Sequence, residues 1–309
     1  MTRYVFRRLL EIVPVLFIVA TLTFFLIHFV PGGPFSAAQN RTIPKEVLAH
    51  IEHHYALDQP VWKQYLLYLG HFLKGDLGPS YKYPTRTVNE LIAQAFPVSA
   101  ELGLWGLALA IFLGLPIGLL SALRPSTRYD YVPMGLALLG MSIPAFVVGP
   151  LLIVLFAIGL GWLDAAGWYS WSDRVLPVLT LGIGGAAGLA RLTRNSMMEV
   201  LSQDFIRSAR AKGASEWAVV FRHALPSGMT PVLAAMGPVL ADVLTGSFAV
   251  EMIFQIPGLG RLFVNAAFNR DYTMVMGSTL FYALLLLLFN LVFDLVLVAL
   301  NPRLKNEQR

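Results

Sequence analysis

Cysteine is absent from the 309 residues, and charged residues are scarce, at 13%. The first absence excludes disulfide frameworks, thiolate metal sites and cysteine nucleophiles. The second excludes ordinary soluble chains, because an average soluble domain carries roughly 25% charged residues. Hydrophobic residues make up 56% of the chain, and the formal net charge is +5. In so apolar a chain we interpret the basic surplus as a topology signal, and we expect no nucleic-acid partner.

Long apolar runs predict six transmembrane helices. A bilayer core of ~30 Å needs about 20 mostly apolar residues in a helix, whose backbone satisfies its own hydrogen bonds. The runs lack the period-two alternation of an outer-membrane barrel. They cover residues 9–30, 98–123, 132–160, 175–194, 229–255 and 274–300. The expected fold class is therefore an all-α polytopic membrane protein.

Basic residues orient these spans. With both termini in the cytoplasm, inner segments hold fourteen of the 23 Lys and Arg residues. Six of the others lie in the loop 31–96, and loops of that length count little in the positive-inside rule. We therefore expect both termini to be cytoplasmic. The first run is too long for the ~7–15-residue core of a signal peptide, so we expect an uncleaved span.

The predicted organisation has four parts. Residues 1–30 form the amino-terminal end and first span, and residues 31–96 form an extracytoplasmic loop with amphipathic stretches at 45–55 and 62–73. Residues 97–300 form a five-helix core that includes a cytoplasmic segment at 199–227. Residues 301–309 form a cytoplasmic tail.

Some patterns resemble chemical sites but favour other interpretations. A loose dinucleotide fingerprint begins at Gly182, inside an apolar run and without a preceding strand. Its Gly184 and Gly188 form a G-x-x-x-G spacing, which predicts close helix packing. His50, His53 and His54 have a spacing that could bind a divalent metal, but a solvated helix face is favoured. The sequence contains no G-x-x-x-x-G-K-[ST] loop, so ATP cannot bind to this chain through a P-loop.

Charges inside spans are functional candidates by default. Asp242 falls mid-way along the fifth run, with Thr245 close by, and Glu251 lies nearer the outer end. Asp242 is expected to face a watery cavity or a partner cation, so these residues are candidates for a translocation path. Prolines inside the runs, among them Pro144, predict kinks.

The segment 199–227 repeats its apolar residues with a helical period. Ile206, Ala209 and Gly213 form one set, and Trp217, Val220, Phe221 and Ala224 form another. The pattern alone allows a basic helix on anionic headgroups or a docking helix for a cytoplasmic partner. Gly213 favours docking, because glycine permits a sharp turn and a close approach.

The same segment resembles the EAA loop of binding-protein-dependent ABC importer permeases. The matching stretches are Asp204-Phe-Ile-Arg-Ser-Ala-Arg-Ala-Lys-Gly213 and Arg222-His-Ala-Leu-Pro226. Gly213, Leu225 and Pro226 fall in register with the family pattern E-A-A-x3-G-x9-I-x-L-P, and Ala209 matches its second alanine. Arg207, Ser208 and His223 replace the glutamate, the first alanine and the isoleucine, as in the peptide/nickel branch.

The resemblance extends over essentially the whole chain, and the permease subunits of oligopeptide importers resemble it best. Landmarks similar to those of this branch occur at residues 4–10, 31–35, 75–80, 96–99, 251–272 and 301–303. Asn301 departs from the usual D-P-R ending.

The resemblance implies a type I ABC importer permease fold in a bacterial inner membrane. The implied partners are a second homologous permease, two ABC ATPases, an extracytoplasmic binding protein, a peptide and membrane lipid. The chain would be a non-catalytic transport subunit without a cofactor or metal, and its partner ATPases would use ATP and Mg. The residues implied in ATPase coupling are Arg207, Ala209, Arg210, Ala211, Lys212, Gly213, Leu225 and Pro226.

Other functions remain open at this point. Within the same branch the substrate could be a nickel complex or glutathione, although peptides of a few residues are expected. A self-sufficient secondary transporter would favour inverted repeats and paired midplane ionisable residues, whereas one central acid and no evident repeat are present. An intramembrane enzyme is disfavoured because the six histidines are scattered.

Overall fold

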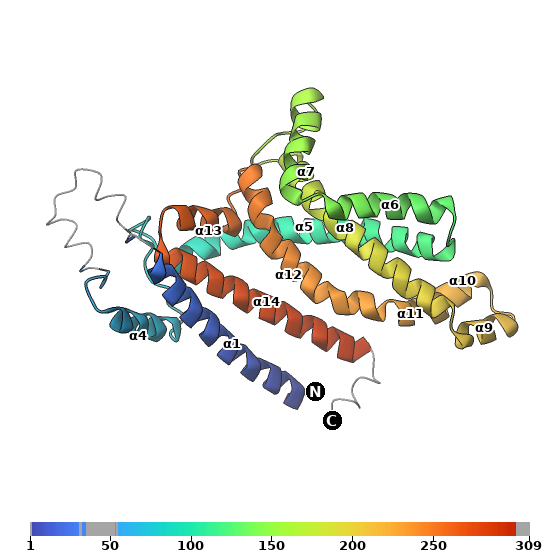
Figure 1. The fold of residues 1–309 in the computed structure, drawn as a ribbon, viewed down its shortest axis with the longest axis horizontal. Coiled ribbons are helices and arrows are strands. Elements are labelled where there is room, and N and C mark those ends of the chain that lie inside the picture. Colours follow the sequence, from blue (N-terminus) through green and yellow to red (C-terminus); the bar gives the residue numbers. More distant parts are fainter. Residues whose placement is uncertain (1, 31–32, 35–52, 54, 301–309) are drawn as a thin grey trace. The chain divides into compact units, whose positions relative to one another are not determined.

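The computed structural model describes residues 2–30, 33–34, 53 and 55–300. Within these ranges the chain is helical, and its one β pairing is an isolated bridge between Pro79 and Thr87 (Figure 1). The expected all-α class is therefore confirmed. Predictions about His50, His54 and the tail 301–309 fall outside the described residues.

Four helices in the described residues are long and apolar enough to cross a bilayer. They are α1 (Thr2–Phe29), α5 (Val88–Leu123), α8 (Trp171–Leu201) and α14 (Tyr272–Leu300). Helix α12 (Thr230–Ile253) occupies the fifth predicted run. The count of six spans and the sidedness of the termini stay predictions.

The third predicted run is not one continuous helix, which corrects the expected span at 132–160. Helix α7 (Ala145–Leu152) continues into the π-helical η1 (Ile153–Gly159). Helix α6 (Arg128–Ser142) meets this stretch at 102°, and the pair makes a fifth span if both belong to one crossing (Figure 1). Ile143 is extended and Pro144 precedes α7. Proline removes a backbone donor and disfavours helical geometry in the residue before it. The kink expected at Pro144 is thus confirmed.

Helix α5 begins ten residues before the predicted run, because a polar cap sets its start. The backbone N–H of Glu90 donates to the Thr87 hydroxyl at 3.2 Å, and the N–H of Thr87 donates to the Glu90 carboxylate at 3.2 Å. This reciprocal pair is a capping box. Hydrophobicity alone could not place this start, since the first turns of α5 carry polar residues.

The chain divides into two compact units. Unit 1 comprises Met1–Pro97 and Gly258–Leu287, and unit 2 comprises Val98–Pro257 and Leu288–Arg309. Unit 1 contains α1, α4 (Val61–Phe72), α13 (Leu259–Phe268) and the first turns of α5 and α14.

An aspartate joins the outer-loop segment of unit 1 to α14. Asp271, directly before α14, is 1% exposed and accepts hydrogen bonds from the Ser80 hydroxyl at 2.5 Å and the backbone N–H groups of Tyr81 and Lys82. It also accepts from the N–H of Met274, which lies in the first turn of α14. The carboxylate therefore caps a helix and fixes a loop with the same two oxygens.

Unit 2 is built on a close contact between α5 and α8. A Cβ added at Gly114 would lie 2.7 Å from the carbonyl oxygen of Ala186, and one at Gly118 would lie 2.4 Å from that of Ala190. Real Cβ atoms do not approach carbonyl oxygens so closely, so only glycine fits at these positions. The two helix backbones touch because glycine has no side chain, and small residues at helix contacts permit such a close approach in membrane proteins.

The glycine pair predicted to pack helices makes no such contact with the described residues. A Cβ at Gly184 or Gly188 would meet no atom within 4 Å. The close-packing pair is instead Gly114 and Gly118 on α5, which have the same four-residue spacing. A four-residue glycine spacing does mark a close helix contact in this chain, but the sequence alone did not identify which glycine pair makes it.

These environments predict opposite effects for one substitution. Gly118→Ala should destabilise the chain by about 1–3 kcal/mol, because the methyl group collides with the backbone of α8. Gly184→Ala should be neutral or stabilising by up to ~1 kcal/mol, because alanine is the better helix former and the space is open. Thermal unfolding of the detergent-solubilised variants measures both. Equal unfolding temperatures for the two variants would refute the contact.

Candidate functional site

The candidate coupling segment, residues 199–227, folds onto the end of α8 in unit 2. It contains α9 (Asp204–Ala211), α10 (Glu216–Ala218) and the π-helical turn η2 (Val219–Ala224), followed by α11 (Leu225–Gly228). Ile206, Val219 and Ala224 are fully buried and form a cluster with Met197 of α8. Helix α9 is therefore fixed to α8 by apolar contacts, and the two should move together.

The sharp turn expected at Gly213 is present. Gly213 has a φ of +82°, a conformation that residues with a Cβ rarely adopt. Its backbone N–H donates to the carbonyl of Arg210 at 2.9 Å, and the N–H of Ala214 donates to that of Ala209 at 3.2 Å. These bonds satisfy carbonyls at the end of α9, as expected for a glycine helix stop.

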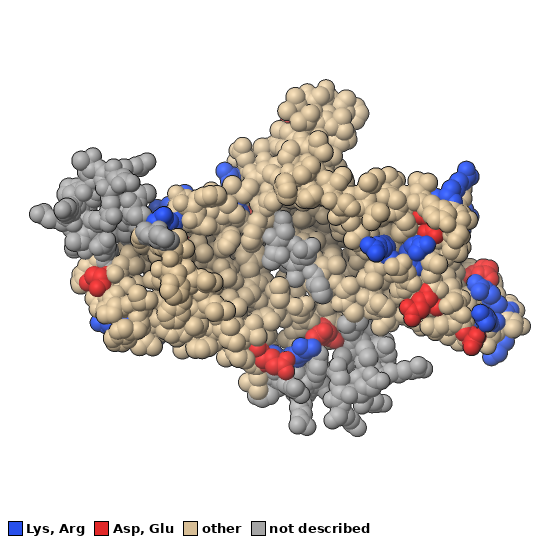
Figure 2. All heavy atoms as spheres, viewed as in Figure 1, with Lys and Arg blue, Asp and Glu red and all other residues tan. Residues whose placement is uncertain are grey.

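Most of the predicted coupling residues are accessible. Ala209 and Leu225 are partly buried against the cluster on α8, whereas the exposed members are Arg207, Arg210, Ala211, Lys212, Gly213 and Pro226. Arg210 donates to both carboxylate oxygens of Glu216, at 2.8 and 3.1 Å. These hydrogen bonds lower the pKa of Glu216 and raise that of Arg210. Figure 2 shows charged side chains gathered around α9 and α10.

Exposed aromatic residues in this segment were not predicted as functional. Trp217 and Phe221 share an apolar periodicity with Val220 and Ala224, but only the latter two are buried. The Trp217 ring is 73% exposed and lies 3.9 Å from that of Phe221, centroid to centroid. The π-helical turn changes the helical register here, which sequence periodicity does not reveal. The sequence signal that could have identified this surface is a large tryptophan in a segment with four Lys and Arg residues.

The three path candidates do not share one face of α12. Asp242 and Thr245 are about 60° apart around the helix, whereas Glu251, nine residues after Asp242, lies on the opposite side. Glu251 is fully buried and accepts a hydrogen bond of 2.7 Å from the Ser99 hydroxyl of α5. Glu251 therefore holds α12 against α5.

A cavity of about 320 Å³ lies within unit 2, between the α6–α7 break, α8 and α12. Gly140, Gly184 and Gly188 contribute to its wall, with Thr180 and two valines of α12. None of the described residues that line it is charged. The open space beside Gly184 and Gly188 thus belongs to a cavity that could admit uncharged groups.

Two arginines anchor the ends of α8. Arg174 donates to Glu101 of α5 at 2.8 Å, and Arg194 donates to Asp130 of α6 at 2.5 and 2.7 Å. Asp130 is only 1% exposed. The arginines are twenty residues apart, or about 30 Å along a helix, which matches the hydrocarbon core of a bilayer. These pairs were not predicted from the sequence.

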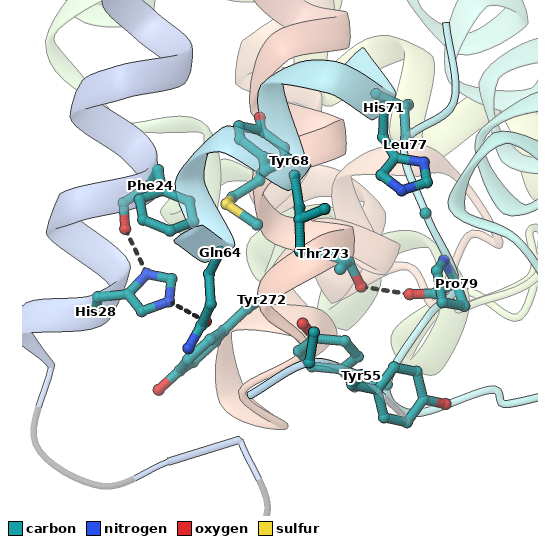
Figure 3. A pocket seen from close by; sticks show the side chains of 15 residues that line it. Phe24, His28, Tyr55, Gln64, Tyr68, His71, Leu77, Pro79, Tyr272 and Thr273 are labelled. Carbon is teal, nitrogen blue, oxygen red and sulfur yellow. Dashed lines mark hydrogen bonds between the residues drawn. The ribbon is translucent and has the colours of Figure 1, made fainter. Parts of the chain in front are cut away.

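Unit 1 contains a separate pocket of about 310 Å³ between α1, α4 and α14 (Figure 3). His28 forms hydrogen bonds with the Phe24 carbonyl at 2.7 Å and with Gln64 of α4 at 3.2 Å. The Tyr68 hydroxyl is buried without a hydrogen-bond partner among the described residues, and this burial raises its pKa. The walls are aromatic, so the pocket suits an apolar group with one polar atom.

No metal-binding group of three His, Cys, Asp or Glu residues occurs in the described part of the chain. His53 pairs with Asp58 at 2.8 Å, and the other two histidines of its motif lie outside the described residues.

Comparison with known proteins shows the family of this chain. Residues 114–306 match the family described as binding-protein-dependent transport system inner membrane component, and residues 1–102 match the corresponding N-terminal family. The chain belongs to this family. It is therefore a multi-pass inner-membrane protein, as expected.

Several peptide transport permeases match this chain along their full length. The oligopeptide transport system permease protein OppB of Haemophilus influenzae is 45% identical over 307 residues, which cover 99% of this chain and 100% of the relative. The OppB protein of Escherichia coli K12 is 44% identical over the same coverage. The dipeptide transport system permease protein DppB of Bacillus subtilis is 42% identical over 309 residues, 100% of both chains.

A solved structure supports the family fold. An inward-facing MetNI methionine ABC transporter matches with a TM-score of 0.58 at 20% identity, over 68% of this chain and 96% of the other. An amino acid ABC transporter matches with a TM-score of 0.52 at 18% identity, over 70% and 94%. At these identities the likeness concerns the fold alone.

In this family member, the Asp130–Arg194 pair should join α6 to α8 energetically. Asp130→Leu or Arg194→Met should each destabilise the chain, because removing one partner of a buried pair costs up to about 3–5 kcal/mol. The double variant should lose less than the sum, with a coupling energy of about 1 kcal/mol or more. Thermal unfolding measures all three variants. Additive losses would show that the pair contributes nothing as a pair.

Proposed function

We propose that the chain is the permease subunit of an ATP-driven importer for oligopeptides or dipeptides. The observation that carries this proposal is the full-length similarity to oligopeptide and dipeptide permeases, at 42–45% identity. The permease would form half of the translocation path in a six-span arrangement with both termini cytoplasmic. It would itself be non-catalytic and bind no cofactor.

The proposed partners follow from what this chain lacks and exposes. No P-loop occurs in the sequence, so two partner ATPases would bind and hydrolyse ATP with Mg. A second, homologous permease would complete the path, and an extracytoplasmic binding protein would deliver the peptide. Exposed Trp217 and Phe221 beside basic side chains would suit a partner surface that is apolar at its centre and acidic at its rim.

We infer that energy coupling passes through α9. Arg207, Arg210 and Lys212 are exposed and can pair with carboxylates of an ATPase. The buried side chain of Ile206 holds α9 against α8. A displacement of α9 by ATPase closure would therefore move α8, and with it α5, whose backbone touches α8 at Gly118.

Asp242 and Thr245 are proposed to face the translocation path. A carboxylate near mid-membrane is costly unless it meets water or a partner, and Asp242 lies in the middle of α12. The cavity lined by Val239 and Val243 lies along the same helix. A role of Glu251 in the path stays a prediction, and the contact that the structure shows for this residue is the one with Ser99.

The positive φ of Gly213 allows a sharp test of coupling. A Cβ there would meet no atom within 4 Å, so Gly213→Val should fail because of backbone strain, which costs about 1–3 kcal/mol. Peptide uptake should fall about tenfold while the chain inserts normally. Gly213→Asn should retain most uptake, because asparagine enters the left-handed region more easily. Arg207→Ala should weaken ATPase co-purification without affecting the turn.

The measurements are ATPase co-purification and peptide uptake for all three variants. Full docking and uptake with valine would refute the coupling-helix assignment. Failure of asparagine and valine alike would assign Gly213 to close contact with the ATPase instead of to the turn.

The path proposal predicts a different phenotype for α12. Asp242→Leu should leave the complex assembled and alter the rate or substrate range of peptide uptake. The matched change at the other side of the helix, Glu251→Leu, should reduce assembly or stability because Ser99 loses its acceptor. Uptake at the normal rate for every tested peptide in Asp242→Leu would limit that residue to a structural role.

A further inference from the structure

Helix α4 of unit 1 has two apolar faces, and only one of them is packed against other described residues. On the packed face, the Tyr65 hydroxyl lies 2.7 Å from the Thr21 hydroxyl of α1, and Gln64 bonds to His28. Tyr65 and Tyr68 pack against the aromatic cluster around Phe24 (Figure 3). This face explains how α4 is held on α1, but it leaves the other apolar residues of α4 unused.

The second face is an exposed stripe. Its members, Trp62, Leu66, Leu69 and Leu73, recur at i, i+4, i+7 and i+11 and so fall within about 60° of one another around the helix. Trp62 is 63% exposed, Leu66 57% and Leu73 84%, whereas Leu69 between them is half-buried. A contiguous exposed apolar stripe of this kind marks an interaction surface.

The position of α4 along α1 indicates what covers the stripe. Its contacts reach from His28 down to Thr21, about 10 Å along the helix axis, so α4 lies beside the outer part of a membrane span. Phe25 of α1 touches Tyr65 with ring centroids 5.4 Å apart and is itself exposed. Exposed Leu22 and Leu26 continue the same surface along α1. The stripe is therefore continuous with the exposed apolar surface of a helix long and apolar enough to cross a bilayer.

The charges of α4 fit the same environment. No acidic residue occurs between Val61 and Phe72. Lys63, whose ammonium group donates to Gln59, and Lys74 follow one edge of the stripe, about 100–120° from Trp62 around the helix. Lysines at the polar edge and a tryptophan in the apolar face are typical of helices that lie in the membrane interface.

We propose that α4 is an interfacial helix that inserts the Trp62–Leu66–Leu69–Leu73 stripe into the bilayer, with Lys63 and Lys74 directed to anionic headgroups. The assignment to the outer leaflet rests on the proposed topology, whereas the lipid contact itself does not depend on the transported substrate. Lipid would thus hold one side of α4, and α1 and α14 would hold the other.

The absence of cysteine allows a direct test by spin labelling. Leu66→Cys places a nitroxide on the stripe, and Gly70→Cys places one on the polar edge, where a side chain meets no atom within 4 Å. The assembled transport complex is reconstituted in nanodiscs containing phosphatidylglycerol. Power-saturation measurements then compare collisions with apolar oxygen and with a water-soluble nickel chelate.

The expected result is a severalfold higher oxygen-to-nickel accessibility ratio at position 66 than at position 70. Equal ratios would overturn the proposal. Shielding of position 66 from both reagents would also overturn it, because protein would then cover the stripe. A label at position 66 that the nickel chelate reaches in the complex alone, and that becomes shielded when the binding protein is added, would overturn the proposal as well. Peptide uptake by the same variants is measured separately, so a failure of the proposed transport function would be distinguishable from a failure of lipid contact.

Discussion

The direct contact between the backbones of α5 and α8 is the constraint on which the rest of unit 2 depends. Because Gly114 and Gly118 carry no side chains, α8 approaches α5 closely enough for carbonyl oxygens to occupy the space of a Cβ. Hydrocarbon provides no hydrophobic force between helices, so such contacts rely on van der Waals packing. Nearer the start of α5, Ser99 donates to the buried Glu251 and so holds α12 against the same helix.

Helix α8 connects every candidate site in unit 2. Its middle lines the cavity, Arg174 and Arg194 pair near its two ends, and its last turns carry the apolar cluster that holds α9. A displacement of α9 would therefore be transmitted along α8 to the wall of the cavity. The break at Ile143–Pro144 lies on the other wall of that cavity, so a rigid helix and an interrupted one face each other there.

Composition and hydrophobic runs predicted the class of this protein and most of its helices, because lipid permits few backbone structures. The motif around Gly213 predicted the helix stop, since a positive φ almost requires glycine there. The Asp130–Arg194 pair could not be predicted, because 64 residues separate its members and the sequence around either residue does not identify the other. The exposure of Trp217 also escaped prediction, because a π-helical turn rotates the apolar pattern. Gly184 shows that spacing predicts a kind of contact without fixing its location.

Arg174 and Arg194 lie about 30 Å apart along α8, a length close to the thickness of the hydrocarbon core of a bilayer. A bilayer thinner than this length is accommodated by helix tilt, at a cost of a fraction of a kcal/mol per Å of mismatch. Since α9 is fixed to the end of α8 through Ile206, tilt of α8 would also displace α9. Membrane thickness would then act on the position of α9, the same helix that the proposed ATPase would displace.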